Sequence, residues 1–334
     1  MRRIAAAALI VAMALGVAWA AAALAIDAPT PLGSVLAAAV AIAGCVTLVA
    51  PIGLGRRVVV LAVIIAAVAS WWFSLEPRND RDWLGDVARA PRTSLDGDRL
   101  TIESVRNFSY RSDGDYDEHW ETRSFDLSKL RGADLFLSYW GSPWIAHTIA
   151  SFEFEEGPAL AISIETRKEK GESYSALLGF FRRYELVYVA ADERDVIGVR
   201  TNHRGEDTYL YRVAMPLDRA RALLVDYAED MNRLADSPRW YNAGTTNCTT
   251  GIRERIEHLG GRNPWDWRIL VNGKLDELMY ERGTIDHSRP FPQVRRASSI
   301  SERAREADGA RDFSARIRDG LPPRPAVEPV GAGG

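Results

Sequence analysis

The sequence has few cysteines and an N-terminal region almost without charge. Only two of its 334 residues are cysteine, Cys45 and Cys248, so the chain is not a disulfide scaffold. The first 75 residues contain four arginines, no lysine and a single acid, Asp27. Subtracting these from totals of 42 and 45 leaves 38 basic and 44 acidic side chains in the rest, a net charge of -6. This body lacks the basic face that a nucleic-acid-binding protein requires.

Several cofactor and catalytic motifs are also absent. The sequence contains no glycine-rich phosphate loop, no G-x-S-x-G motif and no Cys/His spacing suited to zinc. It therefore predicts neither a metal nor an organic cofactor. An apolar content of 47% excludes disorder of the whole chain.

Three apolar stretches occupy the N-terminal region, at residues 4–26, 32–54 and 58–75. About 20 apolar residues in a helix cross the hydrocarbon core of a bilayer, so each stretch predicts a transmembrane helix. Two alternatives remain open. The first stretch also has features of a cleaved signal peptide, and the third could be a buried core helix.

The positive charges of this region predict its orientation. They occur only at Arg2-Arg3 and at Arg56-Arg57, which should remain cytoplasmic. The third span then delivers everything after residue 76 to the outer side, whether or not the first span is cleaved. Trp71 and Trp72 fit the aromatic belt of the outer interface. The bulk of the protein is therefore expected outside the cytoplasm.

The remainder predicts a single α+β domain. We expect an anchor at residues 1–75, a linker at 76–97, the domain at 98–319 and a disordered tail at 320–334. Alternating or continuous apolar runs predict strands at residues 99–105, 122–127, 135–139, 145–154, 159–165, 184–189 and 209–213. Periodicity and terminal residues predict helices at residues 216–234, 248–259 and 275–281.

Residues 145–154 and 159–165 should form a hairpin around the turn that follows Phe154. If the turn comprises residues 155–157, paired numbers sum to 312 and His147 faces Glu165; a one-residue slip would place Thr166 there instead. A carboxylate beside a histidine fixes the imidazole tautomer and stabilises imidazolium. Ser163, on the same face, is the reserve partner. The alternatives are a histidine satisfied within the core and an ordinary polar pair.

Cys248 has no disulfide partner outside the membrane, because Cys45 lies in an apolar stretch. Thr245, Thr246 and Asn247 precede it as capping residues that open a helix. A thiol in the first turn of a helix has a lowered pKa and favours the nucleophilic thiolate, and backbone N–H groups there can hold an oxyanion. An inert buried cysteine is the alternative. Asn247 either caps the helix or orients the site.

Three segments together resemble one bacterial family: YWGSP to AHT (residues 139–148), SIETRKEKGE (163–172) and WYN to TNCTT (240–250). The family is named for the N-terminal periplasmic region of Lnb, a lipoprotein N-acyltransferase. The resemblance spans about residues 106–285 and implies a thiol acyl-enzyme, with Cys248 as nucleophile and His147 as base. The hairpin register adds Glu165 as the group that orients His147. The order of histidine and cysteine is also similar to circularly permuted papain-like folds of the NlpC and lecithin:retinol acyltransferase groups, with an antiparallel sheet packed on helices.

Together with the three predicted spans and their orientation, the resemblance to a bacterial family predicts a multi-pass protein of the inner membrane with a periplasmic catalytic domain. We expect a cysteine acyltransferase or hydrolase that acts on lipoprotein or phospholipid acyl chains, with membrane lipid and lipoproteins as partners. A cell-wall peptidase of NlpC type and a non-catalytic envelope module are the alternatives. Candidate substrate-binding residues, each with core packing or a solvated turn as its alternative, are Asn247, Tyr139, Trp140, Trp240, Tyr241, Arg167 and Lys168.

Overall fold

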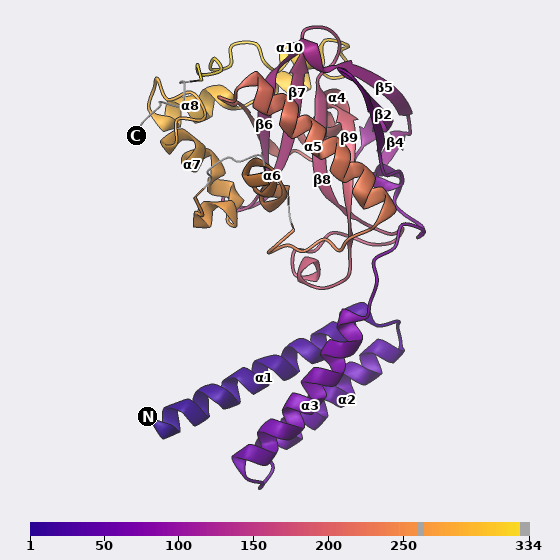
Figure 1. Cartoon of the computed structure of the whole chain (residues 1–334), viewed down its shortest axis with the longest axis vertical. Helices are drawn as coiled ribbons and strands as arrows, with labels where there is room; N and C mark the ends of the chain where they lie inside the picture. The colour runs from indigo at the N-terminus through magenta and orange to yellow at the C-terminus, as the bar shows by residue number, and fades with distance from the viewer. Residues whose placement is uncertain (247, 259–263, 328–334) are drawn as a thin grey trace. The chain divides into compact units, whose positions relative to one another are not determined.

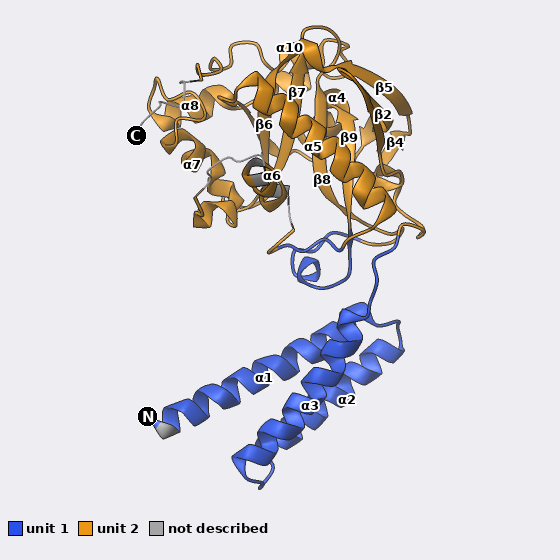
Figure 2. Ribbon diagram, viewed as in Figure 1, with its two compact units in different colours: residues 1–78, 173–185, 240–243 blue, residues 79–172, 186–239, 244–334 orange. Residues whose placement is uncertain are grey.

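A computed structural model of the chain describes residues 1–246, 248–258 and 264–327, and only the backbone of residues 2, 248, 256 and 258. The chain divides into two compact units (Figure 2). Unit 1 comprises residues 1–78, 173–185 and 240–243, and unit 2 comprises residues 79–172, 186–239 and 244–334. The chain therefore passes from one unit to the other several times.

Unit 1 contains three helices that are long and apolar enough to cross a membrane: α1 (Arg2–Asp27), α2 (Leu32–Val49) and α3 (Leu54–Phe73) (Figure 1). Small residues let them pack closely. A Cβ atom added at Gly44 would lie 2.3 Å from Val17 of α1, and one added at Gly16 would lie 2.6 Å from Ile65 of α3. The three predicted apolar helices are confirmed.

The two later segments of unit 1 pack against the ends of these helices. Phe181 is buried in one apolar cluster with Leu24 and other helix residues. The backbone N–H of Arg182 donates to Oδ2 of Asp27 at 3.2 Å, and its guanidinium lies 4.4 Å from the ring of Trp72. Trp240 Nε1 donates to the backbone oxygen of Leu75 at 3.3 Å. Segments far apart in the sequence thus complete the anchor unit.

A mixed sheet forms the centre of unit 2, with strand order β1-β2-β9-β8-β7-β6-β10 and β5 paired with β2. The pairings of β1 with β2, β2 with β5, β6 with β7, β7 with β8 and β6 with β10 are antiparallel, and β2 has a parallel contact with β9. The strands are β1 (Arg92–Asp96), β2 (Arg99–Arg106), β5 (Trp120–Asp126), β6 (Leu130–Tyr139), β7 (Ala146–Phe154), β8 (Leu160–Arg167), β9 (Glu185–Asp192) and β10 (Asp207–Arg212). A separate ribbon pairs β3 (Ser109–Ser112) with β4 (Asp115–Asp117).

Helices cover both faces of the central strands, because both faces carry apolar side chains. On one face, which we call face A, Leu137 and Ala146 pack with Ile252 and Met279. Its helices are α5 (Leu217–Asp236), α6 (Cys248–His258) and α7 (Leu275–Glu281). On the opposite face, face B, Ile149 packs with helix residues in another cluster. Its helices are α4 (Glu193–Val196), α9 (Ser301–Glu306) and α10 (Phe313–Arg316), whereas α8 (Phe291–Ser298) contacts β10.

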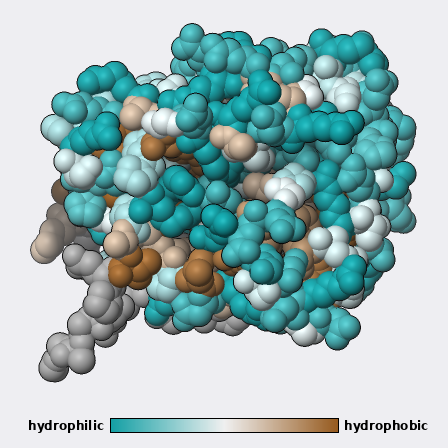
Figure 3. All heavy atoms as spheres, turned by 90° about the horizontal axis from the view of Figure 1, so that it is seen from above, coloured by the Kyte–Doolittle hydropathy of each residue, from teal (hydrophilic) through white to brown (hydrophobic). Residues whose placement is uncertain are grey.

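The α+β class and every predicted strand and helix are present, with bounds shifted by a few residues. The predicted linker at residues 76–97 is wrong in part, since Arg92–Asp96 forms the edge strand β1. The predicted disordered tail is also wrong at its start, because Arg324 bonds to the buried carboxylate of Asp134 at 2.8 Å. Residues 328–334 lie outside the described residues. The permuted papain-like topology stays a prediction. The surface in Figure 3 is mostly hydrophilic, with apolar side chains in small groups.

Candidate functional site

His147 and Glu165 meet on neighbouring strands, as the hairpin arithmetic predicted. β7 and β8 pair antiparallel with Ile149 opposite Ser163, so paired residue numbers sum to 312. His147 Nε2 lies 3.1 Å from Glu165 Oε1 and 2.7 Å from Ser163 Oγ. The Ser163 hydroxyl donates to the same carboxylate at 2.7 Å. The side chains of His147 and Glu165 are 12% and 22% exposed, so the pair is mostly but not fully buried.

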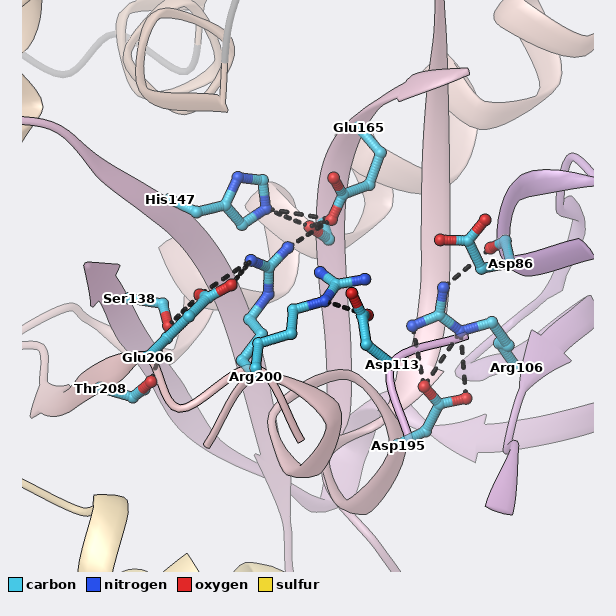
Figure 4. A network of polar contacts seen from close by, with 12 residues as sticks. Asp86, Arg106, Asp113, Ser138, His147, Glu165, Asp195, Arg200, Glu206 and Thr208 are labelled. Carbon is cyan, nitrogen blue, oxygen red and sulfur yellow. Dashed lines mark hydrogen bonds and ion pairs between the residues drawn. The ribbon is translucent and has the colours of Figure 1, made fainter. Parts of the chain in front are cut away.

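A buried arginine extends this pair into a network (Figure 4). Arg200 comes from η4 (Val199–His203) and donates to Glu165 Oε1 at 2.9 Å. Its other terminal nitrogen donates to Glu206 at 3.1 Å, and Glu206 accepts a bond from Ser138 at 2.7 Å. Arg200 was not predicted from the sequence, because no motif around it indicates a contact with β8.

The surroundings of Glu165 keep it ionised. Burial alone would raise the pKa of its carboxyl, but the charges of His147 and Arg200 and two hydrogen bonds outweigh burial and hold the pKa well below its ordinary value. An ionised carboxylate at this position orients the imidazole of His147 through Nε2. The pair therefore has the chemistry of an oriented proton carrier.

Cys248 begins α6, as predicted, and the described residues of the first turns lie on face A of the hairpin. Thr249 Oγ1 lies 3.0 Å from Thr148 Oγ1, and a Cβ atom added at Gly251 would lie 2.6 Å from Ile164. The start of α6 thus rests on β7 and β8, beside the residue that follows His147. The side chain of Cys248 and all of Asn247 lie outside the described residues.

Asn272 ties the start of α6 to the start of β7, and sequence reasoning missed it. Its Oδ1 accepts the backbone N–H of Ala146 at 2.9 Å, and its Nδ2 donates to Thr249 Oγ1 at 2.8 Å. One buried amide thereby fixes the strand that carries His147 against the helix that begins at Cys248. The Asn-Gly pair of residues 272–273 was the only local signal, and it indicates a turn rather than a site.

The imidazole and α6 are on opposite sides of the sheet. Side chains alternate along a strand, so His147 points to face B with Ser163, whereas Thr148 points to face A and contacts Thr249. Both side chains stand close to the start of β7, which begins at Ala146.

Residues 116–273 match the family model described as the Lnb N-terminal periplasmic domain. The match contains His147, Glu165, Arg200, Cys248 and Asn272, and it confirms the resemblance seen in the sequence. No curated protein and no solved structure is significantly similar to the chain. The family match and the three apolar helices together indicate a membrane-anchored periplasmic protein.

An apolar cavity lies on face A beside the start of α6. It has a volume of about 580 Å³ and is lined by Thr249 and Ile252 of α6, by Leu223 of α5 and by Leu278 and Met279 of α7. Pockets of this size and lining hold apolar ligands. The cavity is built partly from residues of the Lnb domain match and partly from α7, which follows it.

The four residues of the predicted aromatic groove are divided between the two units. Tyr139 is buried, and its hydroxyl donates to the backbone oxygen of Gly273 at 3.0 Å, so it is a core residue. Trp140 is 40% exposed. Trp240 and Tyr241 belong to unit 1, where Trp240 is half-buried and Tyr241 is buried. Of these four residues, Trp140 therefore has the most exposed side chain.

The predicted cationic rim is wrong for Arg167. Its guanidinium is buried, donates to the backbone oxygens of Val87 and Ala88 at 3.1 and 2.8 Å, and lies 4.5 Å from the ring of Trp83. The segment before β1 covers the end of β8. Arg167 therefore lies in the core and donates to backbone carbonyl groups, rather than lying on the surface as predicted. Lys168 is half-buried.

Proposed function

We propose that this chain is a membrane-anchored periplasmic cysteine acyltransferase or hydrolase. In this proposal Cys248 is the nucleophile, His147 carries the proton and Glu165 positions the imidazole. The protein sits in the bacterial inner membrane with three spans, and its substrates are acyl chains of lipoproteins or phospholipids.

The proposed reaction has two halves. The Cys248 thiolate attacks the carbonyl carbon of an acyl ester or amide, the carbon–oxygen or carbon–nitrogen bond breaks, and the leaving group takes a proton from the His147 imidazolium. An amine or water then attacks the thioester, gives its proton to the imidazole and releases the thiolate. Since Nε2 faces Ser163 and Glu165, Nδ1 is the nitrogen assigned to proton transfer.

One observation carries the proposal. An imidazole fixed by an ionised carboxylate stands on the strand whose next residue contacts the first turn of the helix that begins at Cys248. The apolar cavity lined by Thr249 and Ile252 adds room for a hydrocarbon chain beside that first turn. Both residues lie within the range 116–273 that matches the family model.

The test uses the full chain in lipid nanodiscs. With Cys45→Ser, Cys248 is the sole thiol, and intact mass spectrometry after incubation with phospholipid or a diacylated lipopeptide should show a hydroxylamine-labile acyl adduct. The adduct should be absent in Cys248→Ser. In His147→Ala its rate of formation should fall about 100-fold or more, as expected for loss of a general acid–base group. Adducts that form equally fast with and without His147 would contradict the assigned roles.

A non-catalytic envelope module is the second candidate, and the bonds of His147 favour it. The imidazole contacts Ser163 and Glu165, which bonds to the buried Arg200, so His147 also has a structural role that needs no reaction at Cys248. The rate of alkylation of Cys248 against pH separates the two candidates. A depressed thiol pKa that returns to its ordinary value in His147→Ala supports the enzyme. A thiol that reacts like free cysteine in both proteins supports the module.

A further inference from the structure

The connection between β8 and β9 contains a loop that belongs to the anchor unit rather than to the sheet. Residues 173–185 cluster with α1, α2 and α3 in unit 1, which Figure 2 draws in one colour. The loop contains a short turn, η3 (Leu178–Phe180), whose Gly179 oxygen accepts the backbone N–H of Ala243 at 2.8 Å. The loop therefore has local structure that backbone hydrogen bonds hold in place.

The loop is docked at one end of the helix bundle. Trp72, near the end of α3, donates to Asp27, at the end of α1, at 2.7 Å, so these two helix ends lie side by side. Arg182 bonds to Asp27 through its backbone and covers the ring of Trp72. Phe181 is buried among the helix residues. This is the end that the positive-inside rule places at the outer leaflet.

Two large apolar side chains of the docked loop are nevertheless exposed. Leu177, just before η3, is 67% exposed, and Phe180, the last residue of η3, is 52% exposed. Gly179 and Phe181, on either side of Phe180, are buried. Together these two side chains form an exposed apolar patch on one turn, the kind of surface that marks a contact with a partner or a membrane when it is large enough. At the end of a transmembrane bundle the same side chains lie at the depth where aromatic and aliphatic groups enter the bilayer interface.

We propose that Leu177 and Phe180 insert into the outer interface of the bilayer that holds α1, α2 and α3. The loop is then a further membrane contact, separate from the three spans and independent of any reaction at Cys248. The occupant is the lipid of that leaflet, because the loop is bonded to helix ends that are themselves surrounded by it. Arg182 continues this contact with its charge at the headgroup level.

The test places an environment-sensitive NBD label at residue 177 or 180 of the full chain. Leu177→Cys and Phe180→Cys are each made with Cys45→Ser and Cys248→Ser, and the labelled proteins are reconstituted in vesicles of phosphatidylethanolamine and phosphatidylglycerol. Leu95→Cys is the matched control, an exposed leucine of β1 in unit 2. Quenching is measured with a nitroxide-bearing lipid and with aqueous iodide.

Labels at 177 and 180 should emit at shorter wavelength than the label at 95. Nitroxide lipid should quench them several-fold more, and iodide several-fold less. Equal quenching by iodide at all three positions would overturn the proposal, since the loop would then lie in water. A blue-shifted label at 177 or 180 that neither quencher reaches would also overturn it, because protein rather than lipid would cover the loop. Both positions are exposed, so the label does not need to enter a core.

Discussion

Glu165 is the residue whose carboxylate contacts both charged partners of the site. Its carboxylate accepts bonds from Ser163 and Arg200 and faces the imidazole of His147 at 3.1 Å. A single charge therefore holds β8, η4 and β7 together. Replacing it changes the orientation of the imidazole and the balance of charge around Arg200 in one step.

Glu165→Gln should reduce stability at neutral pH and flatten its dependence on acid. The folded-state pKa of Glu165 is lower than the ordinary value of 4.5, so its carboxylate stabilises the fold fully above that pH. The contribution is lost as the pH falls through the lowered pKa. We expect the free energy of unfolding at pH 7 to fall by about 1–3 kcal/mol. Thermal unfolding between pH 7 and pH 3 measures both effects.

Glu155→Gln is the matched control, because Glu155 lies in the exposed turn of the same hairpin. It should leave the acid dependence of the melting temperature unchanged. If Glu165→Gln and Glu155→Gln gave the same pH profile, Glu165 would not be the stabilising carboxylate of this network.

The contact between His147 and Glu165 could be predicted from the sequence because it is local. A turn at residues 155–157 and the two-residue period of strands fix which residues face each other. Arg200 and Asn272 could not be predicted in the same way. They reach the hairpin from 35 and 126 residues away along the chain, through folds of η4 and of the segment before α7 that no short pattern specifies.

At the scale of elements, the segment around Gly273 holds the start of β7. A Cβ atom added there would lie 2.4 Å from the backbone carbon of Trp144 and 2.5 Å from the backbone oxygen of Pro143. The Gly273 N–H also donates to the Trp144 oxygen at 3.0 Å. Backbone cannot move aside as a flexible side chain can, so this contact requires glycine.

Gly273→Ala should therefore lower the free energy of unfolding by about 1–3 kcal/mol, the range for an overpacked core position. It should also reduce formation of the acyl adduct, because Asn272 would shift away from Ala146 and Thr249. Gly114→Ala is the control, since nothing lies within 4 Å of a Cβ atom at that position. Denaturant unfolding of both variants is the measurement, and equal midpoints would contradict the proposed packing.

Helices and strands with a clear periodicity of apolar residues could be predicted from the sequence, whereas elements that depend on distant contacts could not. The sequence patterns predicted α5 and α7, and both occur close to the predicted positions. β1 has a mostly exposed sequence and exists because it pairs with β2. The short helices α8, α9 and α10 depend on packing against the sheet, which leaves little trace in eight residues or fewer.

At the scale of the whole molecule, the anchor is not a detachable N-terminal segment. Residues 173–185 and 240–243 lie within the domain by sequence but belong to unit 1. The predicted anchor at residues 1–75 contains all three helices. No periodicity of apolar residues could predict that Phe181, Arg182 and Trp240 belong to the same unit. Such contacts exist only in the folded chain.

A protein that begins at residue 79 should therefore expose the 173–185 loop. Phe181 would lose the helix cluster, and Arg182 would lose Asp27 and Trp72. We expect trypsin to cut after Arg182 or Arg183 about tenfold faster or more than in the full chain, since each 1.4 kcal/mol of lost local stability is a factor of ten. Peptide mapping over time measures the rates.

Cleavage after Lys170 is the internal control for that experiment. Its side chain is 64% exposed and bonds to Asp82, which the shortened protein retains. The Lys170 site should be cut at similar rates in both proteins. Equal rates at Arg182 as well would mean that the three helices do not protect the loop.

The interleaving of the two units also constrains biosynthesis. The three N-terminal helices leave the ribosome first, but Phe181 and Arg182 follow more than 100 residues later, and Trp240 later still. Helix insertion alone cannot finish the anchor unit. Its outer end must wait, partly uncovered, until residue 243 has been translocated, and during that interval it is open to periplasmic chaperones and proteases.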